Sequence, residues 1–390
     1  MISLLLTARA LRAFADGFVA VLLPAYLLAL GHGQLEVGIL STATLFGSAL
    51  ATLAVGRWGH RFALRRLLLG AALLMLATGL GFASLTALWP LLVVAFLGPL
   101  NPSGGDVSVF LPLEHSVLAT AAAAEARTAV FARYSFFGSL SGAVGALAAA
   151  LPEWLAGHSR LQMVDALRLM FVIYAAIGLA VWALYLKLPK ATHRASDSSA
   201  LGPSRRIVWK LAALFSIDSF AGGLVINALL ALWLFQRFGL SLSAAGAFFF
   251  WTGLLSAGSQ LVAPRLAKRI GLINTMVFTH IPASLCLIAA AFAPTLELAL
   301  GLLLARSALS QMDVPARSAY VMSVVTPEER PAAASFTAVP RSLASAAGPS
   351  LAGALFAAGA MAAPLVACGV LKIAYDLALF REFRKVKPSS

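Results

Sequence analysis

The stretch Gly98-Pro99-Leu100-Asn101-Pro102-Ser103-Gly104-Gly105-Asp106 interrupts a long apolar run of the chain. Its prolines and glycines are expected to break a helix and to free backbone carbonyls, which a cavity or a neighbouring helix must then satisfy. A carboxylate at such a depth is costly to bury and therefore marks a candidate pathway or site. The position recurs, because Asp106-Val107 and Ser116-Val117 return as Asp313-Val314 and Ser323-Val324, 207 residues later in both cases.

The composition around this stretch is that of an integral membrane protein. Hydrophobic residues make up 61% of the 390 residues and charged residues 11%, against about 45–50% and about 25% in soluble domains. The apolar runs reach the ~20 residues that a helix needs to cross a bilayer. We therefore expect twelve membrane-spanning helices, at residues 8–30, 35–56, 67–87, 89–119, 128–150, 165–187, 208–235, 241–263, 272–293, 296–324, 332–357 and 361–380.

The net charge of +14 reports orientation and does not indicate a nucleic-acid partner. Most of the 29 Lys and Arg residues fall on one side of the predicted spans, and only Arg160, Arg168 and Arg237 fall on the other. Positive residues concentrate on the cytoplasmic side of membrane proteins. We therefore expect a multi-pass protein of the plasma (inner) membrane with both termini in the cytoplasm and basic residues in contact with anionic lipids.

A polar segment divides the chain into two halves. Residues 189–206 lack apolar periodicity and are typical of a flexible linker. The predicted domains are a six-helix bundle over residues 1–187, a cytoplasmic linker over 188–207, and a second six-helix bundle over 208–390 with a short basic tail. Aligning the halves from their starts places Asp218 opposite Asp16, 202 residues apart. Repeated halves of this kind are typical of transporters that rock about a site at the membrane midplane.

The loop after the second span carries a motif, Gly56-Arg57-Trp58-Gly59-His60-Arg61-Phe62-Ala63-Leu64-Arg65-Arg66. It resembles the Gly-x-x-x-Asp-Arg-x-Gly-Arg-Arg signature of the major facilitator superfamily, in which Gly56, Arg61 and the final arginines match and His60 replaces the acid. The resemblance implies an all-α fold of twelve transmembrane helices, arranged as two six-helix bundles related by a pseudo-two-fold axis. It also implies that spans one, four, seven and ten line the central cavity.

Four acids fall in those spans and are candidates for proton or cation binding. Asp16 has Arg12 four residues before it and Asp313 has Arg317 four residues after it, a spacing that allows a helical ion pair. Asp106 and Asp218 have no basic residue within four positions. We expect these two to be uncompensated carboxylates that bind and release protons, since burial favours the neutral form of an acid. The alternative is an ion pair with an arginine of another helix, for example Arg133 or Arg341.

Other polar residues inside predicted spans are candidates for the substrate cavity or for gating pairs. A ladder of small residues in span five, Gly138, Ser139, Gly142 and Gly145, is interpreted as a surface for close helix packing. The cavity or gating candidates are Asn101, Glu114, Arg133, Tyr134, Arg306, Arg317 and Arg341, and the loop motif adds Gly56, His60, Arg61 and Arg65.

The sequence favours a secondary active transporter of a small solute. It contains no GxxxxGK[ST] motif, HExxH motif or CxxC pair, so we expect no cofactor, no dedicated metal site and no enzymatic activity. Proton-coupled antiport with export is the favoured mode, in a monomeric protein. Two alternatives stay open: a metal-cation exporter that uses Asp106, Asp218 and His115, and a non-transporting sensor or assembly factor.

Overall fold

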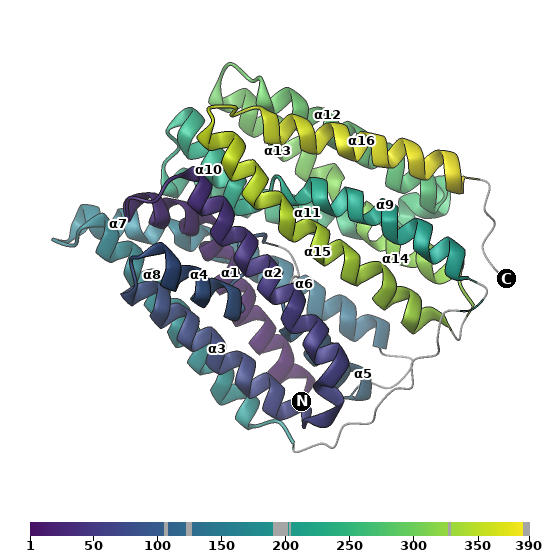
Figure 1. The fold of residues 1–390 in the computed structure, drawn as a ribbon, viewed down its shortest axis with the longest axis horizontal. Helices are drawn as coiled ribbons and strands as arrows, with labels where there is room; N and C mark the ends of the chain where they lie inside the picture. Colours follow the sequence, from purple (N-terminus) through teal and green to yellow (C-terminus); the bar gives the residue numbers. More distant parts are fainter. Residues whose placement is uncertain (105–107, 122–126, 190–201, 203, 327–328, 385–390) are drawn as a thin grey trace. The chain divides into compact units, whose positions relative to one another are not determined.

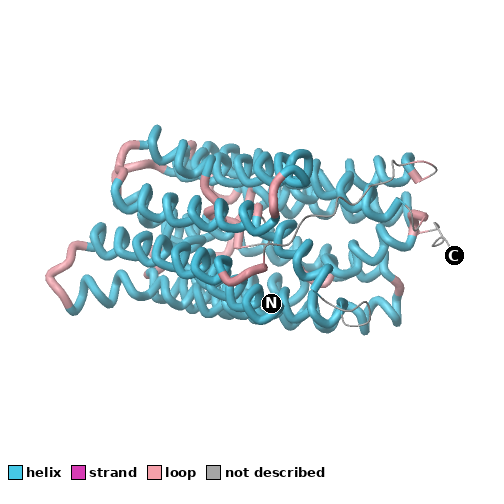
Figure 2. The backbone as a smooth tube through the Cα atoms, turned by 90° about the horizontal axis from the view of Figure 1, so that it is seen from below, coloured by secondary structure: helices cyan, strands magenta, loops and turns pink. Residues whose placement is uncertain are grey.

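The computed structural model describes residues 1–104, 108–121, 127–189, 202, 204–326 and 329–384. Helices joined by short loops make up this described part, and no strand occurs within it (Figure 2). Contacts divide the chain into two compact units. Unit 1 contains Met1–Ala195 and Ile226–Phe250, and unit 2 contains Ser196–Val225 and Trp251–Ser390. The predicted domain boundaries at 187 and 208 stay a prediction.

Each predicted span coincides with one helix or with two consecutive helices. Unit 1 is built from α1 (Ile2–Ala29), α2 (Gln34–Trp58), α3 (Leu64–Ser84), α4 (Leu88–Leu97), α5 (Phe110–Ala121), α6 (Arg127–Leu147), α7 (Leu151–His158), α8 (Met163–Leu186) and α10 (Asn227–Phe238). Unit 2 is built from α9 (Arg205–Gly223), α12 (Leu272–Ala291), α13 (Leu296–Ser310), α14 (Asp313–Ser323), α15 (Arg330–Ala357) and α16 (Ala363–Phe383). The helix α11 (Leu242–Ile270) begins in unit 1 and continues into unit 2.

Nine helical segments of the described chain are long and apolar enough to cross a membrane. The three remaining predicted spans are the fourth, the tenth and the eleventh. The fourth is broken between α4 and α5, the tenth is broken between α13 and α14, and the eleventh is the polar helix α15, which contains Pro340 and Pro349.

The break in the fourth span has the structural consequence that its sequence predicts. The backbone carbonyl of Pro102 lies in the break, outside the helices α4 and α5 of its own span. It accepts a hydrogen bond of 3.1 Å from the backbone N–H of Ala228 at the start of α10. Gly104 has a φ of +70°, and a Cβ atom there would lie 2.1 Å from Nδ2 of Asn227. A glycine at position 104 therefore allows the backbone of the broken fourth span to approach Asn227 of α10 so closely. A neighbouring helix satisfies the freed carbonyl, as expected from the sequence.

Close backbone contacts between small residues hold the first helix of each unit in place. In unit 1, α1 packs on α6, and a Cβ at Gly17 would lie 2.1 Å from the carbonyl oxygen of Gly142. In unit 2, α9 lies beside α15 (Figure 1), and a Cβ at Gly223 would lie 2.2 Å from the carbonyl oxygen of Ser345. The ladder in span five is therefore a packing surface, as predicted.

These contacts also correct the alignment of the two halves. Gly223 takes the place of Gly17, which is 206 residues earlier, so the counterpart of Asp218 is Arg12 and not Asp16. The sequence alignment from the starts of the two halves differs from this register by one helical turn, because the ends of the apolar runs do not mark the contact positions. Buried positions in the two units thus carry opposite charges.

A second pair of contacts fixes the register of the outer helices. In unit 1, a Cβ at Gly79 of α3 would lie 2.6 Å from the carbonyl oxygen of Phe171 in α8. In unit 2, a Cβ at Gly369 of α16 would lie 3.0 Å from the carbonyl oxygen of Ser284 in α12. We align α12 with α3 by matching Ser284 to Gly79, and α16 with α8 by matching Gly369 to Phe171. The residues of these helices can then be compared position by position.

Glu329, at the start of α15, ties the end of the linker to unit 2. Its carboxylate accepts hydrogen bonds from the hydroxyl of Ser204, from the backbone N–H of Gly202 and from the hydroxyl of Thr326. These bonds, the one from Ser204 above all, lower the pKa of Glu329 below its ordinary value. The linker therefore has a fixed attachment point beside α9.

Replacing Glu329 with glutamine should remove a pH-dependent part of the stability. A lowered pKa in the folded state stabilises the protein above the ordinary glutamate value of 4.5, and this contribution is lost as the pH falls. The difference in thermal stability between the wild type and E329Q should shrink on acidification below that value. Glu297→Gln, at an exposed position, is the control. A difference independent of pH would contradict the assignment.

Gly145→Ala should destabilise unit 1. A Cβ at this position would lie 2.0 Å from the carbonyl oxygen of Phe14, so α1 and α6 must separate. Overpacking of this kind costs about 1–3 kcal/mol, measurable as a lower midpoint of thermal unfolding in detergent. The matched control is Gly70→Ala, because no atom lies within 4 Å of a Cβ there. Equal stability of the two variants would refute the close contact.

Candidate functional site: two buried charge clusters

Glu114 is the centre of a polar cluster inside unit 1. Its carboxylate is completely buried and accepts hydrogen bonds from the guanidinium of Arg12 in α1, from the hydroxyl of Tyr134 in α6 and from the hydroxyl of Tyr185 in α8, the last at 2.6 Å. Two cavity candidates of the sequence, Glu114 and Tyr134, are thus brought together. Because four helices contribute to one carboxylate, the cluster fixes their positions relative to one another.

Aromatic rings enclose the arginines of this cluster. The guanidinium of Arg12 lies over the ring of Phe110 at 4.1 Å, and that of Arg9 lies over the ring of Tyr134 at 5.3 Å. Gly138 leaves room for Arg9, since a Cβ there would lie 2.4 Å from its Nε. Cation–π contacts in a site without water stabilise a buried guanidinium.

The capture of Arg12 by Glu114 changes the environment of Asp16. The sequence allowed a local ion pair between Arg12 and Asp16, and that expectation is wrong because Arg12 binds Glu114 on another helix. Asp16 is partly buried near the middle of α1 and makes no hydrogen bond or ion pair with any residue that the structure describes. Asp16 is thus a partly buried acid that no ion pair among the described residues neutralises.

Asp218 is the centre of the second cluster, inside unit 2. It is 3% exposed; its Oδ1 lies 2.6 Å from Nζ of Lys372 in α16, and its Oδ2 lies 3.1 Å from the guanidinium of Arg317 in α14. The expectation that Asp218 is an uncompensated carboxylate is therefore wrong. Its basic partners lie on other helices, and neither is one of the two arginines considered from the sequence.

His280 of α12 joins this cluster to a further acid. Nδ1 of the imidazole lies 3.1 Å from both carboxylate oxygens of Asp376, and Nε2 lies 3.3 Å from Nζ of Lys372. The same Nε2 is 3.8 Å from Oδ1 of Asp218. Histidine, lysine and two acids from three helices thus form one connected set.

Arginines on α14 and α15 complete the second cluster. Arg317 binds Asp313 one turn earlier, as the spacing predicted. Arg341 donates from Nε to the hydroxyl of Ser219 at 3.2 Å, beside Asp218. Counting the formal charges of the side chains, three acids (Asp218, Asp313, Asp376) stand against three bases (Arg317, Arg341, Lys372), so the set is balanced when His280 is neutral.

The register of the two units shows that the fold itself does not require these charges. The pair His280 and Asp376 corresponds to Met75 and Gly178, which also lie together, because a Cβ at Gly178 would approach Cγ of Met75 to 3.1 Å. By the same matching, Lys372 corresponds to Tyr174. The same bundle is therefore built in unit 1 with apolar or neutral side chains at these positions.

The remaining predicted residues are dispersed. Asp106 lies outside the described residues. Asn101 is buried in the broken span and accepts hydrogen bonds from the N–H and hydroxyl of Ser103, at 3.0 and 2.6 Å. The side chain of Arg133 is exposed, and Arg306 is partly buried on α13.

The loop motif has a structural role at one of its positions. Arg65 donates to the carbonyl oxygens of Tyr185 and Leu186, at 3.4 and 2.6 Å, and so caps the end of α8. Gly56 lies in the last turns of α2, and a Cβ there would meet no atom within 4 Å. The backbone of His60 lies in the short helical turn Gly59–Arg61, and Arg61 in the same turn is exposed.

The described residues contain no group of three or more His, Cys, Asp or Glu side chains that could hold a metal ion. His115, a ligand in the metal-exporter alternative, packs edge-on against the rings of Phe131 and Tyr134 instead. The observations on the described chain therefore give the metal-exporter alternative no support.

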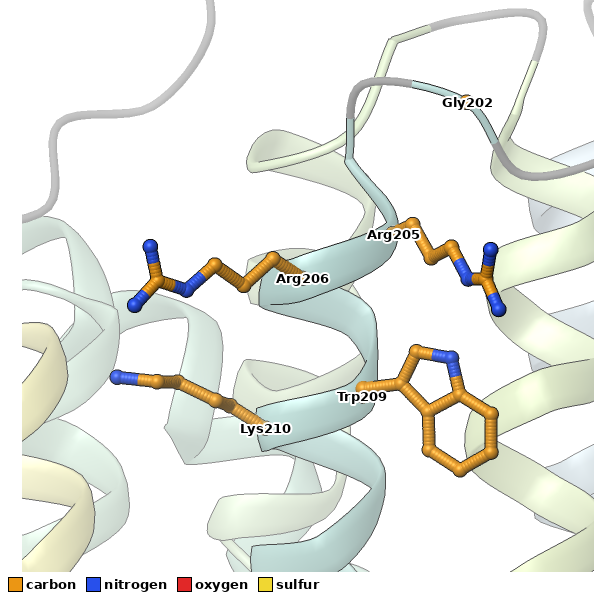
Figure 3. Close-up of a pocket in the computed structure, with 5 residues that line it drawn as sticks. All are labelled: Gly202, Arg205, Arg206, Trp209 and Lys210. Carbon is orange, nitrogen blue, oxygen red and sulfur yellow. The ribbon is translucent and has the colours of Figure 1, made fainter.

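A pocket lies at the start of α9, and none of its lining residues belongs to either cluster (Figure 3). Arg206 and Lys210 extend to one side of the helix, and Arg205 and Trp209 extend to the other. The amine of Lys210 lies 2.6 Å from the carboxylate of Glu382 in α16. The lining is basic and exposed, which suits the end of a membrane helix.

Sequence reasoning missed four members of the clusters: Tyr185, His280, Lys372 and Asp376. A signal was present for three of them, since an ionisable residue inside an apolar span is a functional candidate by default. The restriction to the four helices that line the cavity in the family excluded α12 and α16.

Glu114→Gln should strongly destabilise the protein, because Arg12 would remain buried without a counter-charge. Breaking a buried ion pair in this way costs about 3–5 kcal/mol, whereas Tyr185→Phe should cost only about 1 kcal/mol. Thermal unfolding of the purified variants measures both. The double variant R12M/E114M should regain most of the loss, because an apolar pair can replace a buried ion pair. An E114Q protein as stable as the wild type would contradict this role of Glu114.

Comparisons with known proteins agree with this architecture. A family model described as Major Facilitator Superfamily matches residues 5–312. The uncharacterized membrane protein YJR124C of Saccharomyces cerevisiae is 23% identical over 356 residues, which cover 82% of this chain and 80% of the yeast protein.

Solved structures of transporters share the fold. A bacterial homologue of the human lysosomal transporter Spinster, inward-facing and unoccupied, is similar with a TM-score of 0.77 at 16% identity, covering 100% of this chain and 98% of its own. The xylose transporter XylE from E. coli, in an inward-open conformation, has a TM-score of 0.75 at 14% identity and coverages of 98% and 96%. The fold is all-α, with twelve transmembrane helices in two six-helix bundles. The chain belongs to the Major Facilitator Superfamily of membrane transporters.

Proposed function

We propose that this protein is a proton-coupled secondary transporter of a small solute. The observation that carries the proposal is Asp16, a partly buried acid near the middle of α1 that makes no ion pair with the described residues. An ionisable group at this depth without a partner is by default a functional residue. Its nearest cation along the helix, Arg12, is held by Glu114.

The environment of Asp16 suits reversible protonation. Burial without a hydrogen-bond donor favours the neutral carboxylic acid, and contact with water favours the carboxylate. A transporter that exposes Asp16 to opposite sides of the membrane in turn would load a proton on one side and release it on the other. Glu114 cannot take this role in the described arrangement, because three donors already occupy its oxygens.

Proton-driven export by antiport is the direction that we propose. Unit 1 combines an acid without an ion pair to the described residues with aromatic rings, Phe110 and Tyr134, which contact Arg12 and Arg9 one and two turns earlier in α1. Such a lining suits a cationic or amphipathic organic solute, which would compete with protons for the acid. If the solute and the proton cannot occupy Asp16 at the same time, the transporter carries one of them in each direction, which is antiport.

The basic end of α9 supports the proposed orientation and partners. Arg205, Arg206 and Lys210 would lie on the cytoplasmic side and contact anionic lipid headgroups, with Trp209 at the interface. We propose a monomer in the plasma (inner) membrane with both termini in the cytoplasm.

Asp16→Asn tests the proposal in proteoliposomes with an imposed pH gradient. For the wild type we expect the gradient to drive flux of a cationic amphipathic solute, with proton movement in the opposite direction recorded by an internal pH dye. D16N should lose the proton movement and keep solute exchange between equal pools. Asp165→Asn, which removes an exposed ion pair with Arg168, should behave as the wild type. Full proton movement by D16N would refute the proposed role of Asp16.

A further inference from the structure

We propose that His280 is a second proton-binding residue, and that its protonated form competes with Lys372 for Asp218 inside unit 2. The inference extends the proposed proton coupling to the second unit and rests on it for a role in transport. The competition itself is a property of three side chains and does not require transport to be observed.

The geometry places one cation, Lys372, and one imidazole, that of His280, in reach of one oxygen atom. Oδ1 of Asp218 lies 2.6 Å from Nζ of Lys372 and 3.8 Å from Nε2 of His280. The other oxygen, Oδ2, is taken by Arg317 at 3.1 Å. Lys372 and His280 are themselves 3.3 Å apart. A short movement of one side chain would therefore exchange the partner of Oδ1.

The hydrogen-bond partners of His280 define the state of its ring. Nδ1 faces both oxygens of the Asp376 carboxylate at 3.1 Å and must carry a hydrogen to donate there. Nε2 faces the ammonium of Lys372, which can only donate. Nε2 therefore accepts from Lys372 with its lone pair, and the imidazole is neutral in this arrangement.

The free lone pair of the ring is at Nε2, and a proton that binds there removes the acceptor of the hydrogen bond from Lys372. The lone pair then forms an N–H bond, and the hydrogen bond from Lys372 is lost. Two like charges 3.3 Å apart in a buried site repel each other strongly. The imidazolium can donate to Oδ1 of Asp218, and Lys372 must leave that oxygen. One proton thus exchanges the Asp218–Lys372 pair for an Asp218–His280 pair.

The titratable and charged side chains that face His280 come from three neighbouring helices, α9, α14 and α16. α9 presents Asp218, and α16 presents Lys372, Asp376 and the ring edge of Tyr375. α14 presents Arg317, paired with Asp313, behind Asp218.

The helix α13 also packs on α12. Its buried part carries one charged side chain, that of Arg306. The electrostatic neighbours of Arg306 are the thiols of Cys286 and Cys368. Among the described residues, the anion within reach of an Nε2 proton is therefore Asp218.

The first unit provides a control within the same chain. Met75 and Gly178 occupy the positions of His280 and Asp376, and Tyr174 that of Lys372. The helices pack without the ionisable pair, so its removal by the unit 1 residues need not prevent folding. Retention of buried charges that the fold does not need is typical of ion pathways in membrane proteins.

Histidine NMR of the purified full chain tests the competition directly. The protein has six histidines, and His280→Gln identifies the signal of interest. The signal is followed from about pH 8 to about pH 5, and acidification should convert it from the neutral to the charged form. In Lys372→Met the competing cation is absent, so the change should occur about one pH unit higher, a roughly tenfold greater proton affinity. His158→Gln, at an exposed position on α7, should leave the His280 signal unchanged.

Two results would overturn the proposal: a His280 signal that does not change over this range, or one that changes at the same pH in K372M. The double variant H280M/D376G, which installs the unit 1 residues, guards against loss of folding. It should fold, and the reactivity of Lys372 towards an amine reagent should depend less on pH than in the wild type. Unchanged pH dependence of that reactivity would also count against the competition. D16N, which tests the proposed function, does not enter these measurements.

Discussion

The charge at one buried position of the first helix in each unit must be neutralised, and both cores are arranged around this requirement. The position holds Arg12 in unit 1 and Asp218 in unit 2, 206 residues apart. A charge in a medium of low dielectric is tolerated only with a partner of opposite sign and further hydrogen bonds. The fourth span of unit 1 supplies Glu114, and the tenth span, in unit 2, supplies Arg317. In both units, an ion pair between the first helix and the fourth or tenth span neutralises the buried charge, and the signs of the two partners are reversed between the units.

The two solutions leave different groups available for proton binding. Glu114 is saturated by Arg12, Tyr134 and Tyr185, so unit 1 is left with Asp16 one turn beyond. In unit 2, a lysine and a histidine both lie within reach of Asp218. The three donors on Glu114 leave its oxygens no further partner, whereas the proposed exchange of Lys372 for His280 would give Asp218 two alternative partners. This difference connects the cores of the bundles to the proposed coupling.

Much of the fold could be predicted from the sequence, because span length and apolar composition report directly on the bilayer. The break between α4 and α5 and the ion pair of Asp313 with Arg317 also follow from local rules. The partners of Asp218 could not be predicted, since Lys372 is 154 residues away and cross-helix distances have no local signature. The alignment of Asp16 with Asp218 failed because it started from the ends of the apolar runs, whereas the close contacts of Gly17 and Gly223 set the register.

High-resolution structures at acidic and alkaline pH would test the central claim most directly, through the partner of Oδ1 of Asp218. Above about pH 8, where an ordinary histidine is neutral, Oδ1 should bind Lys372, as in the arrangement described above. Below about pH 5, Nε2 of His280 should lie within hydrogen-bond distance of Oδ1, and the amine of Lys372 should have left it. An Asp218–Lys372 pair that is identical in both structures would contradict the account.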